Sequence, residues 1–131
     1  MNSTIKQQWC SALKSGEYVQ GSGRLKNEDN SFCCLGVLTD LAVKSNVGQW
    51  DVTNWSFNDE TDYLAPNVIE WAGLEKCTNR FGDVQLIWHQ MLEQYGYERE
   101  DYEDSLISLS GLNDDEVPFS VISELITEQL N

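Results

Sequence analysis

Apolar residues recur three and four positions apart in several separate segments, which is the spacing of one face of an α-helix. The pattern predicts helices over residues 4–15, 33–45, 67–72 and 84–95. A last helix starts at the segment NDDEVPF and carries apolar residues from Phe119 to Leu130. Local signals support these bounds, since Ser3 and Asp83 are suitable N-caps and Gly73 follows the third segment. The stripe over 84–95 is the strongest of the chain.

The remaining apolar segments have strand and turn character. In residues 17–32, Tyr18 and Val19 favour a strand that Gly21 and Gly23 interrupt, so an irregular hairpin or one strand and a loop is expected. In the segment QWDVTNWSF, apolar positions flank a turn and predict a short hairpin. Together these elements predict an α+β fold, with four to five helices around one or two small antiparallel hairpins. The length of 131 residues suits one domain, residues 1–131.

Two adjacent cysteines, Cys33 and Cys34, open the apolar run FCCLGVLTDLAV and are the first candidates for chemistry. A cysteine nucleophile needs a base, and the one histidine, His89, is far away in sequence. Zinc sites usually have two cysteines separated by two residues, a spacing that is missing here. We therefore expect both thiols to act as small apolar core residues, with Cys34 the more buried. No catalytic residue, metal ligand or cofactor is assigned.

Charge is distributed unequally along the chain. Residues 1–50 carry five bases and four acids, whereas residues 51–131 carry three bases and eighteen acids, within a net charge of −14. This balance disfavours direct binding to nucleic acid or to an anionic membrane, because both attract Lys and Arg. It favours a partner protein with a basic surface, since complementary charges speed encounter.

The acids of the later part form three clusters. A solvated surface is one interpretation, and a carboxylate array that occupies a nucleic-acid-binding groove is the other. The clusters are Asp59, Glu60 and Asp62; Glu98, Glu100, Asp101, Glu103 and Asp104; and Asp114, Asp115 and Glu116. The first two clusters are the expected partner-binding residues. Trp55 joins them as an exposed anchor, because a two-stranded hairpin cannot bury both Trp50 and Trp55. Trp9, Trp71 and Trp88 follow helical patterns and are expected in the core.

The glycine-rich stretch QGSGRL is an alternative site. It lacks the lysine and the following serine or threonine of a phosphate-binding loop. Backbone N–H groups and one cation can nevertheless form a small polar pocket for an anion in the part of the chain that is not acidic. The expected ligand-binding residues are Tyr18, Gln20, Gly21, Gly23 and Arg24. A nucleotide signal is the ligand class that this alternative implies.

Four stretches carry a resemblance to a known group of proteins: SGEYVQGSGRL, FCCLGVLTDLA, APNVIEWAGL and LNDDEVPFSVISELI. They resemble motifs of a family of small proteins encoded by bacteriophages and prophages. The sequence departs from that pattern at Glu116–Pro118, where a glycine-containing turn is expected, and in a longer connection from Cys77 to Ser110. The resemblance implies a phage origin and a compact fold, and it supplies no catalytic residue.

These observations favour an interaction protein over an enzyme. The expected function is inhibition of a host or anti-phage defence protein by an acidic face, acting as a DNA mimic where that face blocks a DNA-binding groove. Sequestration of a nucleotide by the loop from Tyr18 to Leu25 is the alternative. The oligomeric state is open, with a homodimer among the alternatives. No membrane-spanning run or signal-peptide core is found, so we expect the cytoplasm of a bacterial host.

Overall fold

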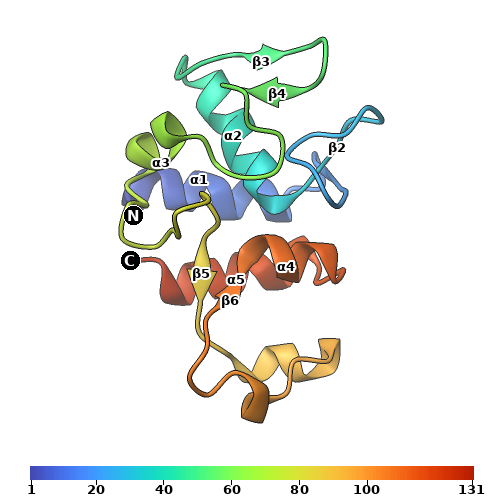
Figure 1. Ribbon diagram of the computed structural model, residues 1–131, viewed down its shortest axis with the longest axis vertical. Helices are drawn as coiled ribbons and strands as arrows, with labels where there is room; N and C mark the ends of the chain where they lie inside the picture. The colour runs from blue at the N-terminus through green and yellow to red at the C-terminus, as the bar shows by residue number, and fades with distance from the viewer.

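Two long helices, α1 (Ser3–Lys14) and α5 (Phe119–Gln129), lie side by side in the computed structural model, which describes residues 1–131 (Figure 1). Helix α1 buries Ile5, Trp9 and Leu13, one residue per turn, as the apolar stripe predicts. Its N-cap is Asn2 rather than Ser3, and the Asn2 side chain accepts the N–H of Ile5. The pairing brings the chain ends together, and the Met1 amino group donates to the Asn131 carbonyl at 3.2 Å.

Helix α2 (Cys34–Lys44) forms the centre of the fold, and all six of its first residues are buried. A close contact between helix α2 and the backbone at Leu25 makes this burial possible. A Cβ on Gly36 would lie 1.7 Å from the carbonyl oxygen of Leu25, so only glycine allows the helix to meet that backbone. Helix α3 (Pro66–Ala72) has Pro66 in its first turn and ends at Gly73, whose φ of 71° is left-handed. These two helices confirm the sequence-based prediction.

Three pairs of two-residue strands complete the α+β fold. Strands β3 (Trp50–Asp51) and β4 (Ser56–Phe57) form the antiparallel hairpin that the sequence predicts. Strands β1 (Val19–Gln20) and β2 (Ser31–Phe32) pair in parallel, so residues 17–32 form neither the irregular hairpin nor the single strand with a loop that the sequence predicts. Strands β5 (Gln85–Leu86) and β6 (Ile107–Ser108) are antiparallel.

The helix predicted over residues 84–95 is wrong. Strand β5 takes its first half, and only Gln90–Tyr95 is helical, as the 3₁₀ helix η1. A second 3₁₀ helix, η2 (Arg99–Asp101), follows within the expected loop. The reason is tertiary. Val84 and Leu86 alternate into the core when β5 pairs with β6, and the backbone hydrogen bonds go to that partner instead of along a helix.

Asp83 therefore does not cap residues 84–95. Its carboxylate accepts the N–H and the hydroxyl of Ser110 in the short helix α4 (Leu109–Asp114), which the sequence did not predict. Burial raises the pKa of Asp83 above its usual range.

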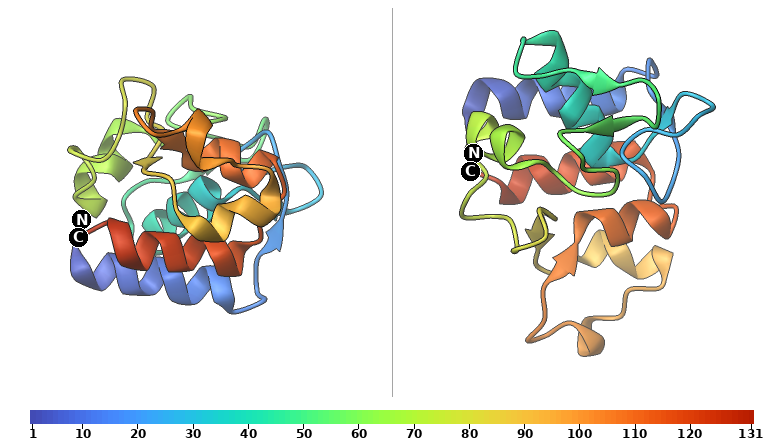
Figure 2. Two further views of the ribbon diagram at one scale, coloured as in Figure 1. Left: turned by 90° about the horizontal axis from the view of Figure 1, so that it is seen from below. Right: turned by 45° about the horizontal axis from the view of Figure 1, so that its top comes forward.

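The elements enclose one core of 30 buried apolar residues. Hairpin β3–β4 lies at one end of the long axis, and residues 88–106, here called the acidic lobe, lie at the other (Figures 1 and 2). Helices α1, α2 and α5 lie between these two ends. None of the helices combines the length and the apolar character that a membrane span requires.

Candidate functional site

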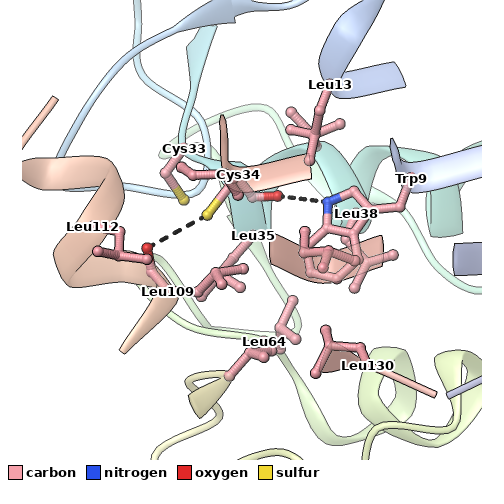
Figure 3. Close-up of a cluster of buried hydrophobic side chains, with 14 of the residues drawn as sticks. Trp9, Leu13, Cys33, Cys34, Leu35, Leu38, Leu64, Leu109, Leu112 and Leu130 are labelled. Carbon is pink, nitrogen blue, oxygen red and sulfur yellow. Dashed lines mark hydrogen bonds between the residues drawn. The ribbon is translucent and has the colours of Figure 1, made fainter. Parts of the chain in front are cut away.

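Cys33 and Cys34 lie inside the core, as expected. Their exposed fractions are 3% and 0%, which confirms Cys34 as the more buried. The Cys34 thiol donates to the Leu109 carbonyl, and the Trp9 indole donates to the Cys34 carbonyl at 3.0 Å (Figure 3). Burial raises the pKa of Cys33 to about 12 and raises that of Cys34 as well. Both groups therefore stay as thiols near neutral pH, the protonation state that suits a packing role.

The loop expected to bind a ligand contains a hydrogen-bonded centre built around Gln20 and Asn113. Gln20 Nε2 donates to Asn113 Oδ1 at 3.1 Å and to the Val117 carbonyl at 2.8 Å, and Gln20 Oε1 accepts the N–H of Phe119. Asn113, 1% exposed, also donates to the Gly21 carbonyl and accepts the N–H of Cys34. These bonds join the segments around Gln20, Cys34 and Asn113, which are far apart in the chain.

The other groups of this loop also have partners within the protein. The N–H of Gly21 donates to the Phe32 carbonyl, and the N–H of Gly23 donates to Asp114 Oδ1. Arg24 Nη2 donates to the Asn54 carbonyl at 2.6 Å, which attaches the loop to hairpin β3–β4. A shallow hollow of about 630 Å³ lies over the loop, but its lining includes the acids Glu28 and Asp29. These acids oppose an anionic ligand, although Arg24 lines the same hollow.

Tyr18 belongs to a polar group beside helix α2. Its hydroxyl donates to Asp40 Oδ2 at 2.6 Å and accepts from Lys44 Nζ at 3.0 Å. Asp40 also accepts the indole N–H of Trp50 at 3.0 Å. Partial burial and the bond to Asp40 raise the pKa of Tyr18. The tyrosine therefore links the loop, α2 and the hairpin.

Trp55 is half-buried because Lys26 covers it. Lys26 Nζ lies 3.8 Å from the centroid of the Trp55 ring, 5.2 Å from that of Phe32 and 5.8 Å from that of Trp50. Trp55 has a φ of 51°, a left-handed conformation that a bulky residue seldom adopts. The contact with Lys26 favours this conformation through the attraction of a cation for ring faces.

The other tryptophans differ in depth. Trp9 is fully buried as predicted, whereas Trp71 and Trp88 are only half-buried at the core edge. Trp88 lies between strand β5 and the 3₁₀ helix η1 rather than on a long helix, and its indole donates to the Tyr97 carbonyl at 2.8 Å. His89, which follows it, is half-buried and lies 3.0 Å from Glu128.

The acid clusters do not share one face. Trp55 and the group of Asp59, Glu60 and Asp62 belong to hairpin β3–β4 and the loop after it. The group from Glu98 to Asp104 belongs to the acidic lobe at the opposite end. The third group, from Asp114 to Glu116, starts at the last residue of α4 and continues into the connection to α5.

The acidic lobe is the most strongly charged surface. It carries six acids and one base, Arg99, and all six acids are exposed: Glu93, Glu98, Glu100, Asp101, Glu103 and Asp104. Buried Leu92 and Tyr97 anchor the lobe to the core. The Tyr97 hydroxyl donates to the carboxylate of Asp115, which fixes the lobe to the end of α4.

Comparison with known proteins assigns a family. The family model described as a domain of unknown function, DUF8296, matches residues 1–130. The chain belongs to this family. No curated protein and no solved structure matches it. In this DUF8296 member, no three His, Cys, Asp or Glu side chains lie close enough together to hold a metal ion.

Sequence reasoning missed three features of this DUF8296 member. Asn113 is read from the sequence only as part of the segment NDDEVPF that starts the last helix, and its bonds to loop 18–25 are not foreseen. Asp83 is expected to cap residues 84–95 and instead accepts the N–H of Ser110 in α4, whose N-cap is Ser108. Ile87 belongs to the apolar stripe predicted over 84–95 and is instead exposed, and Leu106, for which the sequence makes no prediction, is exposed as well. In the sequence, the one signal that this region lies at the surface is the group of acidic residues between Ile87 and Leu106.

Proposed function

We propose that the protein acts by binding, and that its acidic lobe docks on a basic surface of a host or anti-phage defence protein and inhibits it. One observation carries the proposal. The six exposed carboxylates of the lobe are without ion-pair partners, because the two ion pairs of the structure join Lys44 to Asp40 and His89 to Glu128.

Crowded carboxylates repel one another, and this repulsion lowers the stability of the folded state. Lys and Arg side chains of a partner would replace that repulsion with attraction. Complementary fields also raise the rate of encounter and reject partners of the wrong charge. An unpaired acidic projection therefore fits a binding surface better than it fits a structural element.

The lobe also suits imitation of DNA. Exposed carboxylates can stand for backbone phosphates, and a DNA-binding groove is rich in Lys and Arg. A target inhibited in this way would bind the lobe and DNA in competition. The resemblance to phage-encoded proteins supports a host or defence protein as the target.

Only the lobe is included in the proposed docking face. Trp55 belongs to hairpin β3–β4, which lies at the other end of the long axis (Figure 1), and Asp59, Glu60 and Asp62 belong to the loop that follows this hairpin. Gln20, Gly23 and Arg24, which were expected to bind a nucleotide, already have hydrogen-bonding partners within the protein. Nucleotide binding by this loop is therefore not part of the proposed function and stays a prediction.

The test compares two variants of equal charge. The lobe variant is E98Q/E100Q/D101N/E103Q/D104N, and the control variant is E17Q/E28Q/E70Q/E75Q/E124Q. Each removes five exposed acids and changes the net charge from −14 to −9. Each is immobilised, as is the unchanged chain, and bacterial lysate is passed over it at low and at high salt.

We expect the unchanged chain and the control variant to retain the same basic protein at low salt and to release it at high salt. The lobe variant should not retain it. Added double-stranded DNA should displace the protein if the lobe imitates DNA. Equal retention by the two variants, or no specific retention by the unchanged chain, would contradict the proposal.

A further inference from the structure

Strands β5 and β6 expose a pair of apolar side chains. Leu86 pairs with Ile107, and both are buried, with exposed fractions of 2% and 3%. Ile87 follows Leu86 and Leu106 precedes Ile107, just beyond the ends of the two strands. Successive side chains of a strand point to opposite faces, so Ile87 and Leu106 point outward. Their exposed fractions are 63% and 55%. Two adjacent large apolar residues are thus in contact with water at the base of the acidic lobe, and we refer to this pair as the ridge.

The ridge separates two hollows. The first, about 420 Å³, is lined by the ridge with Trp88 and Tyr102 and is bordered by Arg99, Glu103 and Asp104. The second, about 440 Å³, is lined by the ridge and by Leu130, with Lys76 and Glu128 among its polar residues. Each hollow is large enough for one or two apolar side chains of a partner.

The ridge is held in place from helix α5. The side-chain amide of Gln129 accepts the N–H of Ile87 at 2.9 Å and donates to its carbonyl at 3.1 Å. The neighbouring Glu128 lies 3.0 Å from His89 Nε2. Because these bonds order the backbone before a partner arrives, less conformational entropy is lost on binding.

We propose that the ridge docks a basic amphipathic segment of a partner protein, with apolar side chains in the two hollows and Lys or Arg side chains against Glu103, Asp104 and Glu128. This inference rests on the proposed function and adds the chemistry of the partner. Charge complementarity favours a basic segment as the partner of the ridge, because the acidic lobe beside the ridge carries a net charge of −5. The same charge disfavours a second copy of this chain, whose lobe would meet a like charge.

The test uses two labelled peptides of identical Lys and Leu composition as probes. In one, leucines follow helical spacing and form an apolar face, and in the other the order is scrambled. The proteins are the unchanged chain, the ridge variant Ile87→Ser/Leu106→Ser and the control Val19→Ser/Val52→Ser. The control replaces two other exposed apolar residues, whose exposed fractions are 65% and 69%. Thermal unfolding establishes that both variants are folded.

We expect fluorescence anisotropy to show that the ridge variant binds the amphipathic peptide about tenfold more weakly, as loss of an apolar anchor predicts, and that the control binds it unchanged. The scrambled peptide should bind more weakly and respond to neither variant. Equal binding of the two peptides, or unchanged binding by the ridge variant, would overturn the proposal.

The two proposals fail separately. If the five-acid lobe variant loses the peptide and the ridge variant does not, the acidic docking stands and the ridge inference is wrong. If the lobe variant binds both peptides as the unchanged chain does, the proposed function is wrong. A dimer in sedimentation that Ile87→Ser/Leu106→Ser dissociates would assign the ridge to a second copy and overturn the inference.

Discussion

The side chains of Gln20 and Asn113 hydrogen-bond to each other at 3.1 Å, although 93 residues separate them in the chain. Each is also bonded to the backbone of the other's segment, through the Val117 and Gly21 carbonyls. The segments around Gln20 and Asn113 are therefore brought together by a structural requirement. Two amides satisfy buried backbone groups that no regular secondary structure pairs.

The first prediction concerns this pair. Replacement of Asn113 by Ala removes the acceptor of the buried Cys34 N–H and the donor to the partly buried Gly21 carbonyl. We expect the free energy of unfolding to fall by about 2–4 kcal/mol, since each unsatisfied buried group costs about 1–3 kcal/mol. Urea unfolding measures this change. Asn131→Ala, at the exposed chain end, is the control and should cost little. Equal losses in the two variants would contradict the assigned role of Asn113.

The second prediction concerns the thiols. Cys33 and Cys34 are buried with raised pKa, whereas Cys10 and Cys77 are partly exposed. Because the thiolate is the reactive form, a disulfide reagent should modify Cys10 and Cys77 in the folded protein and all four cysteines only after denaturation. The double variant Cys10→Ser/Cys77→Ser should show no reaction until it unfolds. Modification of Cys33 or Cys34 in the folded state, detected by mass spectrometry, would argue that this part of the core opens readily.

The third prediction concerns pH. Burial raises the pKa of Asp83 in the folded state above its unfolded value. Folding therefore favours the protonated form of Asp83. The contribution of this group to the stability is complete below its pKa in the unfolded state, and it is lost as the pH rises through its pKa in the folded state. Asp83→Asn cannot titrate and still offers an oxygen to the Ser110 N–H.

We therefore expect the stability of the unchanged chain relative to Asp83→Asn to fall as the pH rises above about 4, by about 1.4 kcal/mol for each unit of pKa difference. Urea unfolding of the two proteins across this range gives the comparison, in which the titration of the other acids cancels. A difference that stays constant, or that rises with pH, is the result that rejects this assignment.

The fourth prediction concerns the contact between Lys26 and Trp55. Lys26→Met keeps an apolar stem and removes the cation from three ring faces. We expect a loss of about 1–2 kcal/mol in the free energy of unfolding, the size of a partly desolvated cation–π interaction. Lys14→Met changes an exposed lysine on α1 and serves as the control in the same urea measurement. If the two variants differ by less than about 0.5 kcal/mol, the Trp55 conformation does not depend on the cation.

Much of the architecture follows from local signals. Helices α1, α2, α3 and α5 and the hairpin β3–β4 were predicted because each combines its own apolar period with an adjacent cap, proline, glycine or turn. The core role of Cys33 and Cys34 was also predicted, since the sequence offers them neither a nearby base nor metal-ligand spacing. The candidate acids were identified by composition alone, but their division between two ends of the molecule was not.

The sequence by itself determined which segments are apolar, which are acidic and where most helices end, because these properties belong to residues close together in the chain. Only the tertiary structure decided that residues 84–89 are extended, that Gln20 stabilises the fold and that Ile87 and Leu106 face water. The physical reason is that each of these outcomes depends on a distant hydrogen-bonding partner: β6 for β5, Asn113 for Gln20 and Gln129 for Ile87. A periodic pattern indicates which side chains are apolar and which are polar. It does not indicate the distant backbone or side-chain groups to which a segment will hydrogen-bond.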